Sequence, residues 1–167
     1  YDYYRTLKSA IKGHIAGQEP EDISVILESG SSPAERSYNT SAYNVFVSKF
    51  GKSKSISTVQ KPKKHEFFKS GIEIIFDPLF SIETPKGIST YSIWANKTPA
   101  LSQKYGAVAC YLQREAYKNT ALSNSTFFFV DLTKGNAYSE KQITNNTSAI
   151  ARSDFRKIAD LFAHYDI

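Results

Sequence analysis

The chain has a single cysteine, Cys110, among its 167 residues, so it can form no disulfide bond within itself. Long hydrophobic runs are also lacking. The longest, such as Ile72–Phe76 and Thr126–Val130, fall far short of the roughly 20 apolar residues that cross a bilayer. No apolar stretch follows a basic start, so no signal peptide is visible. These absences favour a reducing compartment, and we expect a cytoplasmic protein without a membrane partner.

Composition predicts a folded domain. Hydrophobic residues make up 41% of the chain and aromatic residues 14%, whereas disordered chains are poor in both. A length of 167 residues is usual for one domain. We therefore expect a single domain over 1–167, with N-terminal helices in 1–40, a core in 41–131, and a turn and a helix in 132–167.

Asn-X-Ser/Thr sequons support a different expectation, that of a secreted glycoprotein. They begin at Asn39, Asn96, Asn124, Asn145 and Asn146. A chain rich in Ser and Thr also produces such triplets by chance, so this is a minor alternative.

Positive charge is concentrated in one segment. The net charge is +5, but residues 49–69 hold seven lysines against one acid, Glu66, which gives +6 there and −1 elsewhere. Such a stretch attracts polyanions such as nucleic acid, although a solvated loop has the same composition. The candidate nucleic-acid-binding residues are Lys52, Lys54, Lys61, Lys63, Lys64 and Lys69.

Hydrophobic spacing predicts five helices. They cover about 4–15, 20–27, 42–50, 99–118 and 148–165, with Ser41 capping the third and Thr98-Pro99 opening the fourth. In the last helix we expect the apolar residues to face inward, namely Ile150, Phe155, Ile158, Leu161, Phe162 and Tyr165.

The middle third predicts strands. Segments 56–60, 66–77, 79–82 and 88–94 are rich in strand formers, and Ser70-Gly71 suits a two-residue turn. Segment 126–130 is continuously apolar, which is typical of a strand buried on both faces. The fold class is therefore α/β (α+β), with a central mixed or antiparallel sheet flanked by helices.

Several familiar motifs find no support in the sequence. Gly51-Lys52-Ser53 resembles the end of a phosphate-binding loop, but Phe46 stands where that loop needs its first glycine. His14, His65 and His164 show no metal-ligand spacing. No serine lies in a Gly-x-Ser-x-Gly elbow.

One arrangement resembles a known family. The order helix (42–50), three strands (56–60, 66–77, 88–94), helix (101–118) and strand (126–130) is similar to the core of PD-(D/E)XK nucleases. In Phe76-Asp77-Pro78, Asp77 resembles the acid that the family places after its second strand, and Glu73 shares its face.

The resemblance implies a catalytic set of Asp77, Glu73, Glu83 and Lys97, in which Asp77 and Glu73 bind Mg²⁺ and the metal activates water. One departure is serious. Where the family has an acid-x-Lys triplet, this chain has Ser92-Ile93-Trp94. We therefore expect either a rearranged nuclease site or a degenerate relative that only binds nucleic acid.

Plainer interpretations stand beside these. Asp77 before Pro78 is typical of a turn, Glu73 of the solvent side of an edge strand, and Lys97 of a helix start. The abundant Tyr and Phe residues also fit a non-catalytic domain that binds a protein partner.

Overall fold

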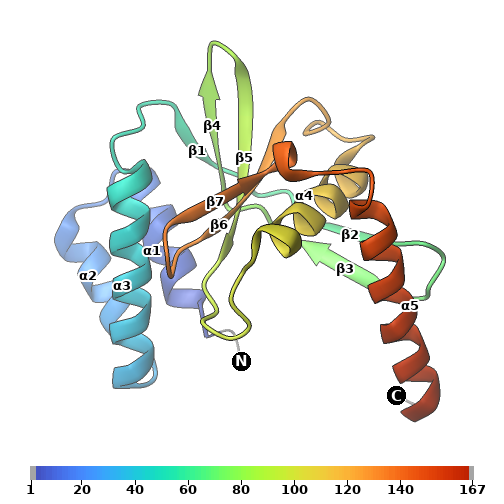
Figure 1. Cartoon of the computed structure of the whole chain (residues 1–167). Coiled ribbons are helices and arrows are strands. Elements are labelled where there is room, and N and C mark those ends of the chain that lie inside the picture. Colours follow the sequence, from blue (N-terminus) through green and yellow to red (C-terminus); the bar gives the residue numbers. More distant parts are fainter. Residues whose placement is uncertain (1–2, 166–167) are drawn as a thin grey trace.

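The structure is a computed structural model that describes residues 3–165 (Figure 1). Within that range, five α-helices surround a mixed five-stranded sheet, and two further strands form a small second sheet. The predicted α/β class, with a central sheet flanked by helices, is confirmed.

The N-terminal third is helical. It contains α1 (Arg5–Ile15), α2 (Pro20–Glu28) and α3 (Pro33–Phe50). The predicted start of the third helix at Ala42 is wrong. Ser32 caps α3, since its hydroxyl accepts a hydrogen bond from the Glu35 amide at 3.1 Å, and Pro33 occupies the first helical position. The expected division at residue 40 therefore falls inside a helix.

Five strands build the central sheet: β1 (Ile56–Thr58), β4 (Phe80–Thr84), β5 (Gly87–Trp94), β6 (Thr126–Asp131) and β7 (Asn136–Ser139). They lie in the order β1-β4-β5-β6-β7. All neighbours are antiparallel except β5 and β6, which run parallel. Only a crossover can join parallel neighbours, and α4 (Gln103–Tyr117) provides it.

The predicted second core strand, 66–77, is not part of this sheet. Its residues belong to a separate hairpin of β2 (Lys63–Glu66) and β3 (Glu73–Phe76), and β4 takes the place beside β1. The turn is longer than the predicted Ser70-Gly71, since β2 ends at Glu66 and β3 begins at Glu73; within it, Phe68 and Lys69 adopt positive φ angles of 59° and 53°. Phe67, at the start of that turn, packs on α5 rather than on the central sheet, and its ring centroid lies 5.5 Å from that of Phe155.

Helix α4 begins later than Thr98-Pro99 predicted. Ser102 caps it, accepting a hydrogen bond from the Tyr105 amide at 3.3 Å. The Leu101 carbonyl accepts one from the Tyr138 hydroxyl at 3.2 Å. A contact to β7 therefore holds residue 101 outside the helix.

Helices cover both faces of the central sheet. On one face α1 and α3 supply Leu7 and Phe46, which pack with Val130 of β6. On the other face α4 and α5 (Thr147–Tyr165) supply Leu112 and Phe155, which pack with Phe127. Phe127 and Val130 are fully buried, as predicted for a strand enclosed on both faces.

The C-terminal region departs from prediction twice. After the turn at Gly135 the chain forms β7 and a 3-10 turn (Glu140–Gln142) before α5, rather than a turn alone. In α5, the expected inward positions Ile158, Leu161 and Phe162 are exposed by 40%, 56% and 46%, because no element of the described chain covers that half of the helix. The side chain of Tyr165 lies outside the described residues.

Candidate functional site

The predicted acids lie on two different sheets. Glu73 in β3 and Asp77 directly after it are exposed on one side of the small hairpin, whereas Glu83 lies near the tip of the β4–β5 hairpin. The Glu73 carboxylate forms an ion pair with Lys64. Across residues 3–165, no three His, Cys, Asp or Glu side chains come together as metal ligands could. The structure therefore does not gather the predicted acids Asp77, Glu73 and Glu83 into one cluster.

Ser92, in the segment where the resemblance to the nucleases would place an acid-x-Lys triplet, belongs to a buried neutral pair. Ser92 of β5 is buried, and its hydroxyl accepts a hydrogen bond from the Gln113 amide nitrogen of α4 at 3.0 Å. Gln113 is itself fully buried. The side chains of Ser92 and Gln113 satisfy each other's hydrogen bonds, and both are neutral. This part of β5 therefore carries no charged group.

Tyr117 lies one helical turn after Gln113 on α4 and is buried in the same layer, between α4 and the sheets. Its hydroxyl donates to the Lys61 carbonyl at 2.5 Å and lies 3.3 Å from the Phe76 carbonyl. Burial, with a smaller contribution from the charge of Asp77, raises the pKa of Tyr117 to about 12. The phenol therefore ties the β2–β3 hairpin to the central core as a neutral donor.

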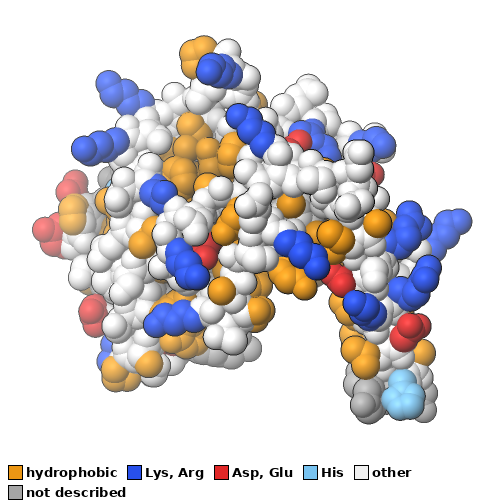
Figure 2. Space-filling model, viewed as in Figure 1, with side chains coloured by type: hydrophobic (Ala, Val, Ile, Leu, Met, Phe, Trp, Pro, Cys, Tyr) orange, Lys and Arg blue, Asp and Glu red, His pale blue; other side chains and the backbone are white. Residues whose placement is uncertain are grey.

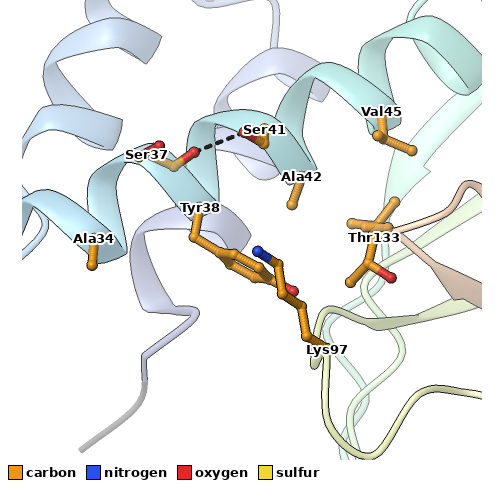
Figure 3. Close-up of a pocket in the computed structure, with 9 residues that line it drawn as sticks. Ala34, Ser37, Tyr38, Ser41, Ala42, Val45, Lys97 and Thr133 are labelled. Atoms are coloured by element: carbon orange, nitrogen blue, oxygen red, sulfur yellow. Dashed lines mark hydrogen bonds between the residues drawn. The ribbon is translucent and has the colours of Figure 1, made fainter.

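An open pocket lies elsewhere, where the parallel strands β5 and β6 end. A cavity of about 240 Å³ is lined by Ser37, Tyr38 and Ser41 of α3 and by Lys97 and Thr133. Figure 3 shows the Tyr38 ring next to the Lys97 side chain. Lys97 follows the end of β5, and Thr133 follows the end of β6. Crevices at the carboxyl ends of parallel strands are the usual ligand sites of such sheets.

The predicted catalytic Lys97 lies in this pocket, away from the predicted acids. Its Nζ is 4.9 Å from the centroid of the Tyr38 ring, and no carboxylate of the described chain pairs with it. The Tyr38 hydroxyl donates to the Ala95 carbonyl. Burial raises the pKa of Tyr38, so its phenol stays neutral beside the ammonium group. The pocket therefore presents a cation that has no acidic partner.

The hydroxyls of the pocket differ in what they can donate. Ser41 already donates to the Ser37 carbonyl at 2.9 Å, and Thr133 donates to Asp131 Oδ1 at 2.6 Å. No hydrogen bond to the Ser37 hydroxyl is found in the described chain. Lys97 and Ser37 are therefore the donors that remain for a ligand.

Asp131, at the end of β6, holds the far wall in place. It is fully buried, and its Oδ1 accepts hydrogen bonds from both the amide and the hydroxyl of Thr133. Its Oδ2 is buried without a partner among the described residues. The sequence analysis did not single out Asp131, although an acid directly after the predicted strand 126–130 was a signal that could have found it. Nothing in the sequence pointed to Gln113 or Tyr117.

The six predicted lysines do not form one patch. Lys52 and Lys54 lie in the loop after α3, whereas Lys61, Lys63, Lys64 and Lys69 lie in and around the β2–β3 hairpin. Figure 1 places that loop and the turn of the hairpin at opposite sides of the molecule. The continuous run of charge in the sequence is therefore divided in space.

A different set of lysines surrounds the pocket. Lys49 of α3 packs on the β6–β7 turn, where a β-carbon on Gly135 would lie 2.7 Å from its Cε. Lys134 is exposed in the same turn, and Lys97 lines the pocket. None of the three has an ion-pair partner in the described chain. Figure 2 shows basic side chains spread over the face that carries α3 and this turn, with fewer acidic ones.

One sequon is inaccessible. Asn39 is fully buried in α3, and its amide nitrogen donates to Thr6 Oγ1 at 2.8 Å and to the Tyr3 carbonyl at 3.0 Å. A glycan could not be attached there without breaking these contacts.

No family model matches this chain, and no curated protein or solved structure matches it either. Among residues 3–165, no helix combines the length and the apolar character needed to cross a membrane.

Proposed function

We propose that this domain binds nucleic acid at the pocket between α3 and the ends of β5 and β6, and that it is a nuclease-like domain without hydrolytic activity. The observation that carries the proposal is the group Lys49, Lys97 and Lys134 around this pocket, three cations for which residues 3–165 provide no acidic partner. Phosphate oxygens would accept hydrogen bonds from Lys97 and Ser37, and the outer lysines would neutralise neighbouring phosphates.

The order of elements supports the nuclease-like part of the proposal. Helix α3 is followed by the antiparallel strands β1, β4 and β5, then by α4 and by β6 parallel to β5. This is the helix, three strands, helix and strand order that the resemblance to PD-(D/E)XK nucleases implies, with the β2–β3 hairpin inserted after β1.

The closed layer under α4 supports the absence of hydrolysis. Ser92 and Gln113 are neutral and bonded to each other on β5 and α4, and Glu73 is held by Lys64. A hard divalent cation needs several oxygen ligands in one shell, and the predicted acids are not arranged to supply them.

Fluorescence anisotropy with labelled 20-nucleotide DNA and RNA, single-stranded and duplex, tests the binding. We expect affinity to fall steeply between 50 and 200 mM salt, as it does when lysines contact phosphates. The triple variant Lys49→Gln, Lys97→Gln, Lys134→Gln should lower the salt slope by about 3. The exposed lysines Lys86, Lys118 and Lys141, changed to Gln together, provide a control with the same change in charge.

Two results would overturn the proposal. If the two triple variants bind nucleic acid equally well, the pocket is not the binding site. Cleavage of the same oligonucleotides in Mg²⁺ or Mn²⁺ that is lost in Asp77→Ala would show a working nuclease site instead.

A further inference from the structure

The apolar stripe of α5 continues past the body of the domain. Ala151 and Phe155, in the first half of the helix, are buried, with only 1% and 5% of their surface exposed. Ile158 and Phe162 follow Phe155 at helical spacing on the same face, and Leu161 lies beside them. These three side chains are 40–56% exposed, and Figure 1 shows this half of α5 extending away from the sheet. The stripe therefore lacks a partner along its outer half.

A groove opens at the base of this exposed stripe. It lies between the β2–β3 turn and α5 and encloses about 200 Å³, with Phe68 and Phe155 among its lining residues. Arg152 and Arg156 of α5 also line it, and the Arg152 guanidinium is 4.8 Å from the centroid of the Phe68 ring. The groove thus has aromatic walls, two guanidinium groups and no carboxylate in its lining.

The charged residues near the groove differ in whether they are already paired. The Glu66 carboxylate accepts a hydrogen bond from the Gly71 amide at 2.9 Å, and Asp154 lies 3.8 Å from Lys157. Asp160 is exposed further along α5, and Lys69 is exposed in the hairpin turn. Neither Arg152 nor Arg156 has a carboxylate partner in the described chain. The two guanidinium groups are therefore available to an acidic ligand.

We infer that α5 and the β2–β3 turn form a docking surface for an acidic amphipathic segment of a partner protein. Apolar side chains of that segment cover Ile158, Leu161 and Phe162, and one of them enters the groove. Its carboxylates pair with Arg152 and Arg156, whose planar groups suit bidentate contacts. A nucleic acid would satisfy the arginines but leave the apolar stripe in water, so the combination favours a protein.

This surface is separate from the nucleic-acid pocket. Figure 1 shows α3, which forms one wall of the pocket, and α5 on opposite sides of the molecule. Figure 2 shows both hydrophobic and basic side chains exposed along α5. The inference therefore goes beyond the proposed function, and either one can fail without the other.

Peptide selection tests the inference without a known partner. Random 16-residue peptides displayed on phage are selected against the immobilised chain, and the enriched sequences are made as fluorescein-labelled peptides. We expect them to combine Asp or Glu with large apolar residues three, four and seven positions apart. Two double variants, Arg152→Ser with Arg156→Ser and Leu161→Ser with Phe162→Ser, should each weaken binding at least about tenfold.

Two control variants show that the loss is local. Val25→Ser with Ile88→Ser removes apolar side chains that are 70% and 43% exposed, in α2 and near the tip of the β4–β5 hairpin. Arg5→Ser with Lys86→Ser removes two exposed cations, one in α1 and one at the tip of the β4–β5 hairpin, both outside α5 and the β2–β3 turn. Both controls should bind the selected peptides like the original chain, and thermal melts should show that all four variants fold.

Three outcomes would overturn the inference. The first is selected peptides without acidic residues, or with affinities that the α5 variants leave unchanged. The second is flotation with phosphatidylserine vesicles that depends on Leu161 and Phe162, which would assign the face to a membrane surface. The third is a dimer in sedimentation equilibrium that the same variants dissociate, which would assign it to a second copy.

Discussion

Two polar regions lie next to β5, and they differ in how their polar groups are satisfied. Under α4, Ser92 and Gln113 bond to each other in a fully buried layer. Beyond the end of the strand, Lys97 lines a cavity of about 240 Å³ and has no acidic partner in the part of the chain that the structure describes. The first region contributes to stability, because its groups have exchanged water for each other. In the second region Lys97 has made no such exchange. It therefore contributes little to stability and is available to a ligand.

The sharpest test of the closed region is Gln113→Ala. We expect a loss of about 3 kcal/mol in the free energy of unfolding, because the change opens a cavity and leaves the Ser92 hydroxyl unpaired. Urea denaturation measures it, and the exposed Gln103→Ala in the same helix should change stability by less than about 0.5 kcal/mol. A similarly small loss for Gln113→Ala would mean that the buried pair contributes nothing.

Alkaline pH should weaken the closed region next. The pKa of Tyr117 is raised from 10.0 to about 12 in the folded chain, so the unfolded chain loses this proton first. The stabilisation is present below pH 10 and is lost as pH rises towards 12, by up to about 3 kcal/mol. Urea denaturation from pH 8 to 11.5 should show the Tyr117→Phe variant losing less stability than the original chain, and parallel curves would contradict this.

At neutral pH, Tyr117→Phe should have a smaller effect. It removes the hydrogen bond to the Lys61 carbonyl while keeping the ring, so we expect a loss of about 1 kcal/mol. The exposed Tyr105→Phe in the same helix is the matched control and should be neutral. An unchanged midpoint of urea denaturation for Tyr117→Phe would indicate that water replaces the phenol hydroxyl without any loss of stability.

The smallest stability effect belongs to the open region. Lys97→Gln should change the free energy of unfolding by less than about 0.5 kcal/mol, because within residues 3–165 the Tyr38 ring is the only partner found for Lys97. It should nevertheless lower the salt slope of nucleic-acid binding by about 1, the contribution of one phosphate contact. A large loss of stability with unchanged binding would reverse the roles of the two regions.

The sequence predicted the local elements better than their spatial arrangement. Helix spacing located α1, α2 and α5, and an unbroken apolar run located β6, because these signals come from neighbouring residues. The placement of β2 and β3 outside the central sheet depends on Phe67 packing against Phe155, a contact between distant parts of the chain. Local patterns carry no information about such a contact.

For the candidate site, too, the sequence indicated individual residues but not which of them lie together. Lys97 was singled out from the sequence, but for a role beside Asp77, and its actual neighbours are Tyr38 and Thr133. Which segments meet at the end of β5 depends on the parallel pairing with β6, which the order of elements alone does not fix. The apolar spacing of α5 placed Phe155 in the core correctly, but its prediction that Ile158, Leu161 and Phe162 face inward was wrong.

The order of the strands also limits how another chain can attach. The longest strand, β5, lies in the middle of the central sheet, and the rims are formed by β1 and β7, with three and four residues. Such short rims offer few vacant amide and carbonyl groups to an incoming strand, which protects against edge-to-edge aggregation. Association with other macromolecules should therefore proceed through side chains on helices and loops rather than by extension of the sheet.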